Sequence, residues 1–188
     1  MIGDLPQSLI VGGVEYKIKS DFRDILDILE AFDDPNLKEG EKIYVCLAIL
    51  YEDFEKMPKD LYNDAYKEAI KFIDHGQESK NAIKSPKVMD WEQDEAIIFS
   101  AVNKVAGFET RSADYIHWWT FLGYYMEITD GIFARVVSIR SKKSRGKKLE
   151  KWEREFAQAN SSLVKLKRKI SDEEREIMDR INAKIKGG

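Results

Sequence analysis

The sequence predicts a mainly α protein, a multi-helix bundle with a small β-hairpin near its N-terminus. Apolar residues recur at helical spacing along most of the 188 residues, and strand-like runs occur only around Gly12-Gly13. Nine Phe, eight Tyr and four Trp, among 43% hydrophobic residues, provide enough apolar mass for a packed core. The charged fraction of 35% therefore indicates solvated helical surface, because disordered chains lack such aromatic residues.

Residues 5–19 are expected to form the hairpin, with two apolar-rich strands that meet at Gly12-Gly13. An isolated hairpin is only marginally stable, so this one should pack against helices. We assign the hairpin and the helices after it to one domain, residues 1–160. Residues 161–188 are expected to form a C-terminal helical arm.

Three helices are predicted between the hairpin and a polar loop near the middle of the chain. Ser20 or Asp21 can cap the first of them, because short polar side chains accept hydrogen bonds from the first free amides of a helix. Pro58 favours the start of the third, because proline suits a first helical turn. The predicted helices cover about 22–32, 39–55 and 58–76, and the loop covers 77–89.

Five further helices are predicted after the loop. Asp90 is expected to cap the first of them, and Ser112 or Asp114 is expected to open an aromatic helix. Thr129 should cap a helix that leads into a basic run. Ser171 begins a capping-box pattern that starts the last helix. The first of these helices covers 91–106 and ends before Gly107, and the aromatic helix ends near Ile128. The third runs from 130 into the basic run. The fourth covers 148–160 and is followed by a break at Ser161-Ser162, and the last begins at 171.

The only cysteine, Cys46, lies in an apolar run over residues 43–50 and is expected to be buried, so no disulfide framework is possible. The first residues lack the basic and apolar regions of a signal peptide. No apolar stretch approaches the roughly 18 residues of a membrane-spanning helix. A soluble intracellular protein without a membrane partner is therefore expected.

Few residues indicate catalysis or metal binding. The chain has two histidines, and His117 follows Asp114 at a spacing that would allow a carboxylate–imidazole pair on one helix face. No nucleophile or further ligand accompanies this pair, and the acidic clusters lack the pattern of a calcium loop. We therefore expect a protein with no enzymatic activity, no cofactor and no metal.

The segment from Tyr115 to Ile128 is strongly aromatic. On a helix its large side chains form a stripe that widens well beyond one face, which is typical of a central core helix. An aromatic face left exposed would instead be a strong interaction site, and this alternative stays open. The residues concerned include Trp118, Trp119, Phe121 and Tyr125.

A basic run follows, with six cations and no acid in residues 140–148. Such a run could bind phosphates, and nearby aromatic side chains could stack on bases. Those aromatic residues belong to another helix, however, and the chain has a net charge of −3 and a pI near 5.6, so nucleic acid is a disfavoured partner. We expect an exposed partner-binding patch formed by Arg140, Lys142, Lys143, Arg145, Lys147 and Lys148.

One motif is more specific than the composition. It reads Asp114-Tyr-Ile-His-Trp-Trp-Thr-Phe-Leu-Gly123, and Ile139-Arg-Ser-Lys142 follows at a helix end. The N-terminal part adds Leu5-Pro6, Val14-Glu-Tyr-Lys-Ile18 and Asp21-Phe-Arg23. Over residues 5–160, this pattern resembles the phage gene-product-fifteen family, which occurs in long-tailed phages and prophages of Gram-positive bacteria.

The resemblance implies a role in tail morphogenesis, in the cytoplasm of the bacterial host. Genes of the family usually lie between those for the major tail protein and the tape-measure protein, where tail-assembly chaperones are encoded. The implied partners are the tape-measure protein, the major tail protein and a companion tail chaperone. Two other interpretations stay open: a nucleic-acid-binding module that uses residues 140–148, and a minor structural protein of the virion.

Overall fold

The computed structural model describes residues 3–76 and 86–186, and these residues are mainly α with a two-stranded hairpin, which confirms the predicted fold class. Residues 77–85 of the predicted loop fall outside the described ranges. The strands are β1 (Ser8–Val11) and β2 (Val14–Lys17), and the α-helices are α1 (Phe22–Asp33), α2 (Glu39–Leu50), α3 (Tyr62–Ile73), α4 (Glu95–Ala106), α5 (Trp118–Met126), α6 (Gly131–Ser144), α7 (Lys151–Ala159), α8 (Ser161–Val164) and α9 (Asp172–Lys186).

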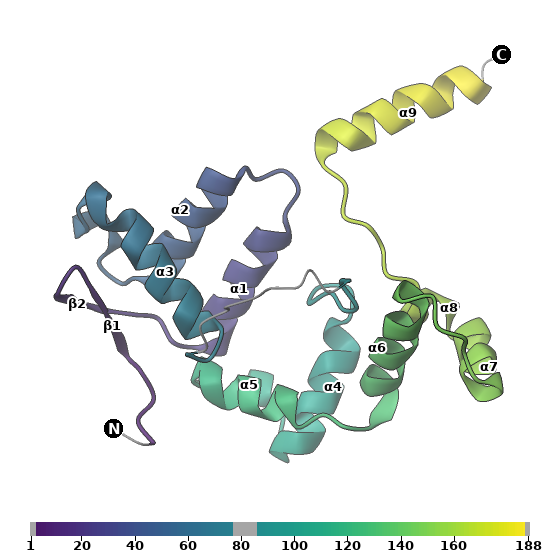
Figure 1. Cartoon of the computed structure of the whole chain (residues 1–188), viewed down its shortest axis with the longest axis horizontal. Coiled ribbons are helices and arrows are strands. Elements are labelled where there is room, and N and C mark those ends of the chain that lie inside the picture. Colours follow the sequence, from purple (N-terminus) through teal and green to yellow (C-terminus); the bar gives the residue numbers. More distant parts are fainter. Residues whose placement is uncertain (1–2, 77–85, 187–188) are drawn as a thin grey trace.

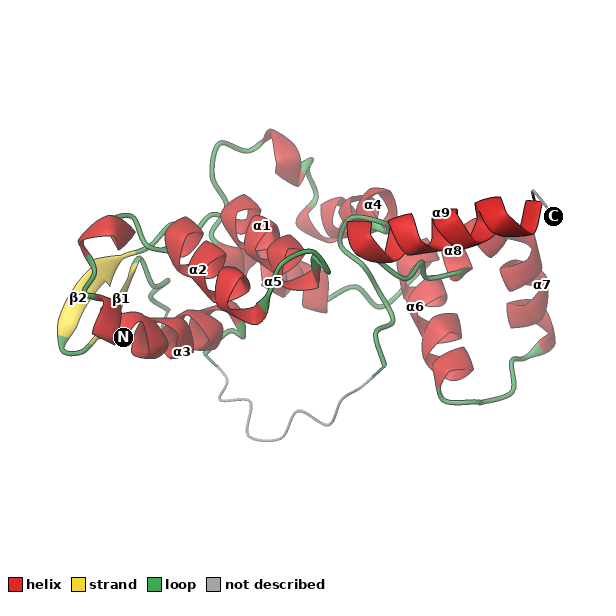
Figure 2. Ribbon diagram, turned by 90° about the horizontal axis from the view of Figure 1, so that it is seen from above, coloured by secondary structure: helices red, strands yellow, loops and turns green. Residues whose placement is uncertain are grey.

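The elements form an elongated arrangement. In Figure 1 the hairpin and α1–α3 lie at one end, α4, α6, α7 and α8 lie at the other, and α5 lies between them. Helix α9 projects away from the other helices in this view. Figure 2, turned by 90°, again shows the hairpin at one end and α7 and α9 at the other.

The hairpin forms at the predicted place. Its strands pair antiparallel with Val11 opposite Val14, and Gly12 and Gly13 fill the turn with φ of 57° and 81°. A two-residue turn with positive φ at both positions matches the twist of the strands and favours glycine. A Cβ on Gly12 would lie 2.8 Å from a methyl carbon of Leu61, so glycine also allows the turn to approach the segment before α3. Val11 is buried and β1 packs against α3, as expected for a supported hairpin.

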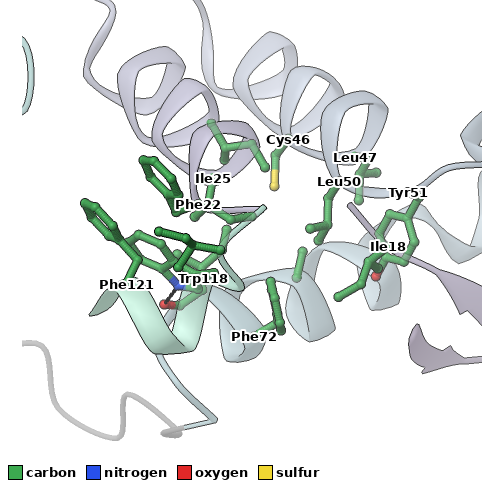
Figure 3. Close-up of a cluster of buried hydrophobic side chains, with 14 of the residues drawn as sticks. Ile18, Phe22, Ile25, Cys46, Leu47, Leu50, Tyr51, Phe72, Trp118 and Phe121 are labelled. Atoms are coloured by element: carbon green, nitrogen blue, oxygen red, sulfur yellow. Dashed lines mark hydrogen bonds between the residues drawn. The ribbon is translucent and has the colours of Figure 1, made fainter. Parts of the chain in front are cut away.

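The core of this end lies where α1, α2, α3 and α5 meet (Figure 3). Helix α1 turns Phe22, Ile25 and Ile28 inward, at the spacing that predicts the helix. Asp21 is its N-cap, one of the two predicted residues. Cys46 on α2 is fully buried, as predicted, and burial raises the pKa of its thiol to about 12.

Helix α2 begins as predicted but ends at Leu50 rather than near residue 55. Tyr51 leaves the helix in an extended conformation and pairs with Ile18, just after the hairpin. The Lys19 N–H donates to the Leu50 carbonyl oxygen at 2.8 Å and holds this crossing in place. The continuation of the hairpin therefore ends α2, and helical periodicity cannot show such a contact.

Helix α4 begins after the predicted position because a closed turn precedes it. Asp90 does not cap the helix. Its Oδ1 accepts from the Gln93 N–H at 2.8 Å, and its own N–H donates to Asp94 Oδ2 at 3.0 Å. These bonds hold residues 91–94 in a turn. The helix ends at Gly107 as predicted, with φ of 80° at this residue.

Three further helices begin later than predicted. Residues 59–61 form a 3-10 turn before α3. Asp130 rather than Thr129 is the N-cap of α6, and α7 begins at Lys151 rather than near 148. In each case the type of element is predicted correctly, and the residues just before it take another conformation.

The predicted helix end near residue 160 is confirmed, because α7 ends at Ala159. The break lies at Asn160 rather than at the predicted Ser161-Ser162, since α8 begins at Ser161 and packs against α6. The chain extends toward α9 only after Val164. The last helix begins at the predicted capping box, where Ser171 Oγ accepts from the Glu174 N–H at 3.1 Å.

Candidate interaction surfaces

Helices α1 and α5 begin at one shared junction. The extended segments before them pair antiparallel: the Phe22 N–H donates to the Ile116 carbonyl oxygen at 3.0 Å, and the Trp118 N–H donates to that of Ser20 at 2.7 Å. The Asp21 carboxylate, which caps α1, also accepts from the Ile116 N–H at 3.0 Å. Three hydrogen bonds thus fix the start of one helix against the start of the other.

This junction corrects the predicted start of the aromatic helix at Ser112 or Asp114. A 3-10 turn covers Thr110–Ser112, a bend covers residues 113–114, and the chain then runs without helix to His117, the N-cap of α5. That stretch cannot be helical, because its backbone groups bond the segment before α1. Asp114 is exposed, and the carboxylate–imidazole pair that a helix would have allowed does not form.

His117 is buried, and both nitrogens of its ring are bonded. Nδ1 accepts from the Trp119 N–H at 3.0 Å, and Nε2 lies 2.9 Å from the Pro6 carbonyl oxygen. Because Nδ1 is an acceptor, the neutral ring carries its proton on Nε2 and donates it to Pro6. Burial lowers the pKa of His117, and the bond to Pro6 opposes this shift only in part. The histidine therefore ties the N-terminal segment to the start of α5.

The two tryptophans of the motif cap the end of α3. The Trp118 Nε1–H donates to the Ile73 carbonyl oxygen and the Trp119 Nε1–H donates to that of Phe72, each at 2.8 Å. The last carbonyl groups of a helix lack partners within it, so the Trp118 indole satisfies a buried acceptor at Ile73. The Trp119 indole adds a second donor to the Phe72 oxygen, which also accepts from the His75 N–H at 3.2 Å. Figure 3 shows Trp118 and its hydrogen bond in the core, close to Phe121.

The other side chains of α5 extend this core toward α4 and α6. Phe121 is fully buried and stacks on Phe22, with ring centroids 4.3 Å apart and an interplanar angle of 5°. Tyr125 is half-buried, and its ring centroid lies 5.2 Å from that of Trp91. Met126, at the end of the helix, is 61% exposed. The aromatic side chains of α5 are thus mainly core, and Trp118 and Phe121 do not form an exposed face.

Arg140, predicted to belong to an exposed basic patch, is instead buried at 5% exposure. Its guanidinium forms two hydrogen bonds to the Asp94 carboxylate, at 2.5 and 2.9 Å. The sequence holds a signal for this burial, because Arg140 lies four residues after Val136 on the face of α6 that packs inward. The remaining donors of Arg140 bond three backbone carbonyl oxygens, those of Val88, Leu163 and Val164.

Lys142 is also partly withdrawn from the predicted patch. Its Nζ lies 2.6 Å from Oε1 of Glu153, whose side chain is 1% exposed. Asp94 and Glu153 belong to the α4 and α7 regions, and the sequence does not show that these regions face α6. Four predicted members of the patch are exposed, namely Lys143, Arg145, Lys147 and Lys148.

A groove of about 310 Å³ lies between α1 and the start of α4. Phe22 and Leu26 on α1 contribute apolar lining, as do Trp91 and Phe99 from the α4 region. Sequence reasoning missed this groove because it depends on how two separate helices are placed side by side. Five acidic side chains and three cations border it: Asp27, Glu30, Asp33, Glu92, Glu95, Arg23, Arg111 and Lys169. The guanidinium groups of Arg23 and Arg111 lie over the rings of Phe22 and Phe99.

Residues 3–76 and 86–186 lack a cluster of metal ligands and a membrane-spanning helix. No group of three or more His, Cys, Asp or Glu side chains in these ranges is placed to hold a metal ion. None of the helices there combines the length and the hydropathy that crossing a bilayer needs.

The fold and its motif define a mainly helical protein in which the His-Trp-Trp residues join three parts of the chain. The chain belongs to a phage family, described as Bacteriophage Gp15 protein, whose family model matches residues 1–166. This match confirms the resemblance seen in the sequence. It covers every element up to α8 and ends before α9. No curated protein and no solved structure matches the chain.

The buried His117 predicts a pH dependence of stability. Its pKa in the folded protein lies below the ordinary value of 6.5, so below this pH the unfolded chain takes up a proton more readily than the folded one. The free energy of unfolding should therefore fall as the pH is lowered from about 6.5 through the folded pKa. Urea unfolding of the protein and of His117→Asn, measured from pH 7.5 to 5.0, would test this.

His117→Asn keeps an acceptor at the helix cap but cannot titrate in this range. We expect it to be less stable by about 1 kcal/mol at pH 7.5, because the bond to Pro6 is lost. Its stability should then change less with pH than that of the parent protein. If the free energy of unfolding changes equally with pH in the two proteins, titration of the buried His117 ring does not cause the pH dependence.

The buried pair of Arg140 and Asp94 predicts that loss of the Arg140 charge destabilises the protein strongly. Loss of the nearby Lys143 charge should destabilise it little. Arg140→Met leaves the Asp94 carboxylate buried without its counter-charge, so the free energy of unfolding should fall by about 3 to 5 kcal/mol. Lys143→Met removes an exposed cation and should change it by less than about 0.5 kcal/mol. Urea unfolding measures both values. If the free energy of unfolding falls by a similar small amount in both variants, Arg140 is a surface cation.

Proposed function

We propose that this phage protein is a tail-assembly chaperone that binds the tape-measure protein without enzymatic chemistry. The observation that carries the proposal is the groove between α1 and α4, which has an apolar lining and a border with more acidic than basic side chains. Family membership supports the phage part of the proposal. The groove supports the part that concerns a helical partner.

The apolar lining of the groove suits a helix with an apolar stripe. Phe22 and Phe99 are nearly buried and form a firm base, whereas Leu26 and Trp91 are half-buried and can be contacted from outside. Amphipathic helices bind such grooves through apolar side chains spaced one turn apart. A tape-measure protein is a long helical chain with apolar seams, so a groove of this kind could cover one of its seams during assembly.

The border of the groove favours a partner with basic residues beside its apolar stripe. Within the described ranges, Asp27 and Glu30 on α1 form no ion pair, so their charges are available to a partner. Such rim charges steer encounter and orientation more than they add affinity. Nucleic acid fits this border poorly, because the five acids of the border outnumber its three cations and repel phosphate groups.

Co-expression with fragments of the tape-measure protein tests the proposal. The protein should raise the soluble yield of the fragments and purify with them. Leu26→Gln removes an accessible apolar contact of the groove, so it should weaken fragment binding about tenfold. Ile10→Gln is a matched control, because Ile10 is 69% exposed on the hairpin, away from the groove.

Equal binding by the two variants would show that the groove is not the binding site. Fragments that stay insoluble, with no tail component recovered alongside the protein, would contradict the chaperone role itself. Mass spectrometry of purified particles separates a chaperone, which should be absent, from a minor structural protein of the virion, which should be present.

A further inference from the structure

Helix α9 presents an apolar stripe that nothing in the described chain covers. Ile177, Met178 and Ile181 are 44%, 52% and 52% exposed, and residues 175–184 are all exposed. At its start, the Asp172 N–H donates to Asn36 Oδ1 at 2.8 Å. Beyond that point the helix extends away from the neighbouring elements, as Figure 1 shows.

A partner is needed to explain this stripe. An isolated helix of about 15 residues is only marginally stable in water, and most helices in proteins are stabilised by packing one face. Most polar residues of α9 lie on the opposite side of the helix, and Glu173 and Lys184 flank the stripe, so the helix is amphipathic. Because the family match ends at residue 166, α9 is an addition to the matched region with a surface of its own.

The charges of α9 indicate which partner fits. Its first turn holds Asp172, Glu173 and Glu174, whereas its second half holds Arg180 and Lys184. Two such helices packed antiparallel set the acidic turn of one beside the basic half of the other. Their macrodipoles are then also opposed, which is favourable. A parallel pair would bring like charges together instead, which is unfavourable.

We infer that α9 is a self-association helix through which two copies of this chain pair antiparallel. The contact would centre on Ile177, Met178 and Ile181, with Glu173 of one copy beside Lys184 of the other. A single helix of this length offers less than the roughly 800 Å² per partner that a stable interface buries. The dimer should therefore be weak and reversible, with a Kd on the order of 10 to 500 μM.

This inference is independent of the proposed function, because the groove between α1 and α4 is a separate surface. Experiments can therefore contradict the self-association of α9 without contradicting the chaperone function, and the reverse. A protein whose α9 variant no longer dimerises should still bind tape-measure fragments. A Leu26→Gln variant that no longer binds those fragments should still dimerise.

Sedimentation equilibrium of the full chain, from about 5 to 500 μM, tests the association. Ile181→Asp places a charge in the stripe and should raise the Kd at least about tenfold. Ala183→Asp adds the same charge on the exposed opposite side of α9 and should leave the Kd within about twofold. Circular dichroism should show both variants folded, since the rest of the chain does not pack on these residues.

Disulfide trapping tests the direction of the pair. Glu173→Cys and Lys184→Cys variants, mixed and oxidised, should form mixed dimers in preference to dimers of either variant alone. Cys46 should not compete, because it is buried and its thiol has a pKa raised to about 12. A chain that stays monomeric throughout, a Kd unchanged by Ile181→Asp, or preferential self-linking of each single variant would overturn the inference.

Discussion

The pairing of Ser20–Phe22 with Ile116–Trp118 is the constraint on which the rest of this fold depends. The two segments are far apart in the sequence, yet each leads directly into a helix whose start the other holds. Asp21 contacts both segments, because its carboxylate caps α1 and also accepts a hydrogen bond from the Ile116 N–H before α5. Two helices that begin at one point must then lie side by side at their first turns. This is where Phe22 and Phe121 stack.

The other features of the molecule follow from this junction. With the start of α5 fixed, Trp118 and Trp119 reach the end of α3, and His117 reaches the N-terminal segment. On the other side, the Phe99 ring on α4 packs against the stacked rings of α1 and α5, with centroids about 6 Å away. This contact also forms the base of the groove that we propose as the partner site. The motif of residues 114–123 therefore determines how the groove between α1 and α4 is shaped. Its own residues contribute little exposed area to that groove.

Local signals predicted much of the fold, whereas contacts between distant segments produced the corrections. The hairpin at Gly12-Gly13, the cap at Asp21 and the helix end at Gly107 were predictable because each depends on a few neighbouring residues. The start of α5 was not, since its preceding backbone bonds a segment 95 residues away. The sequence predicts Arg140 at the surface because six cations in a short run are usually solvated. Its burial depends on Asp94, an acid that only the tertiary structure places opposite it.

Native-state hydrogen exchange of the backbone amides tests the central role of the junction most directly. The amides of Phe22 and Trp118, which donate across the junction, should exchange only when the whole molecule unfolds. Their opening free energies should equal that of the Tyr51 amide, which the core encloses. If Phe22 and Trp118 instead exchange through a local opening while Tyr51 stays protected, the junction is a peripheral contact and this account of the fold is wrong.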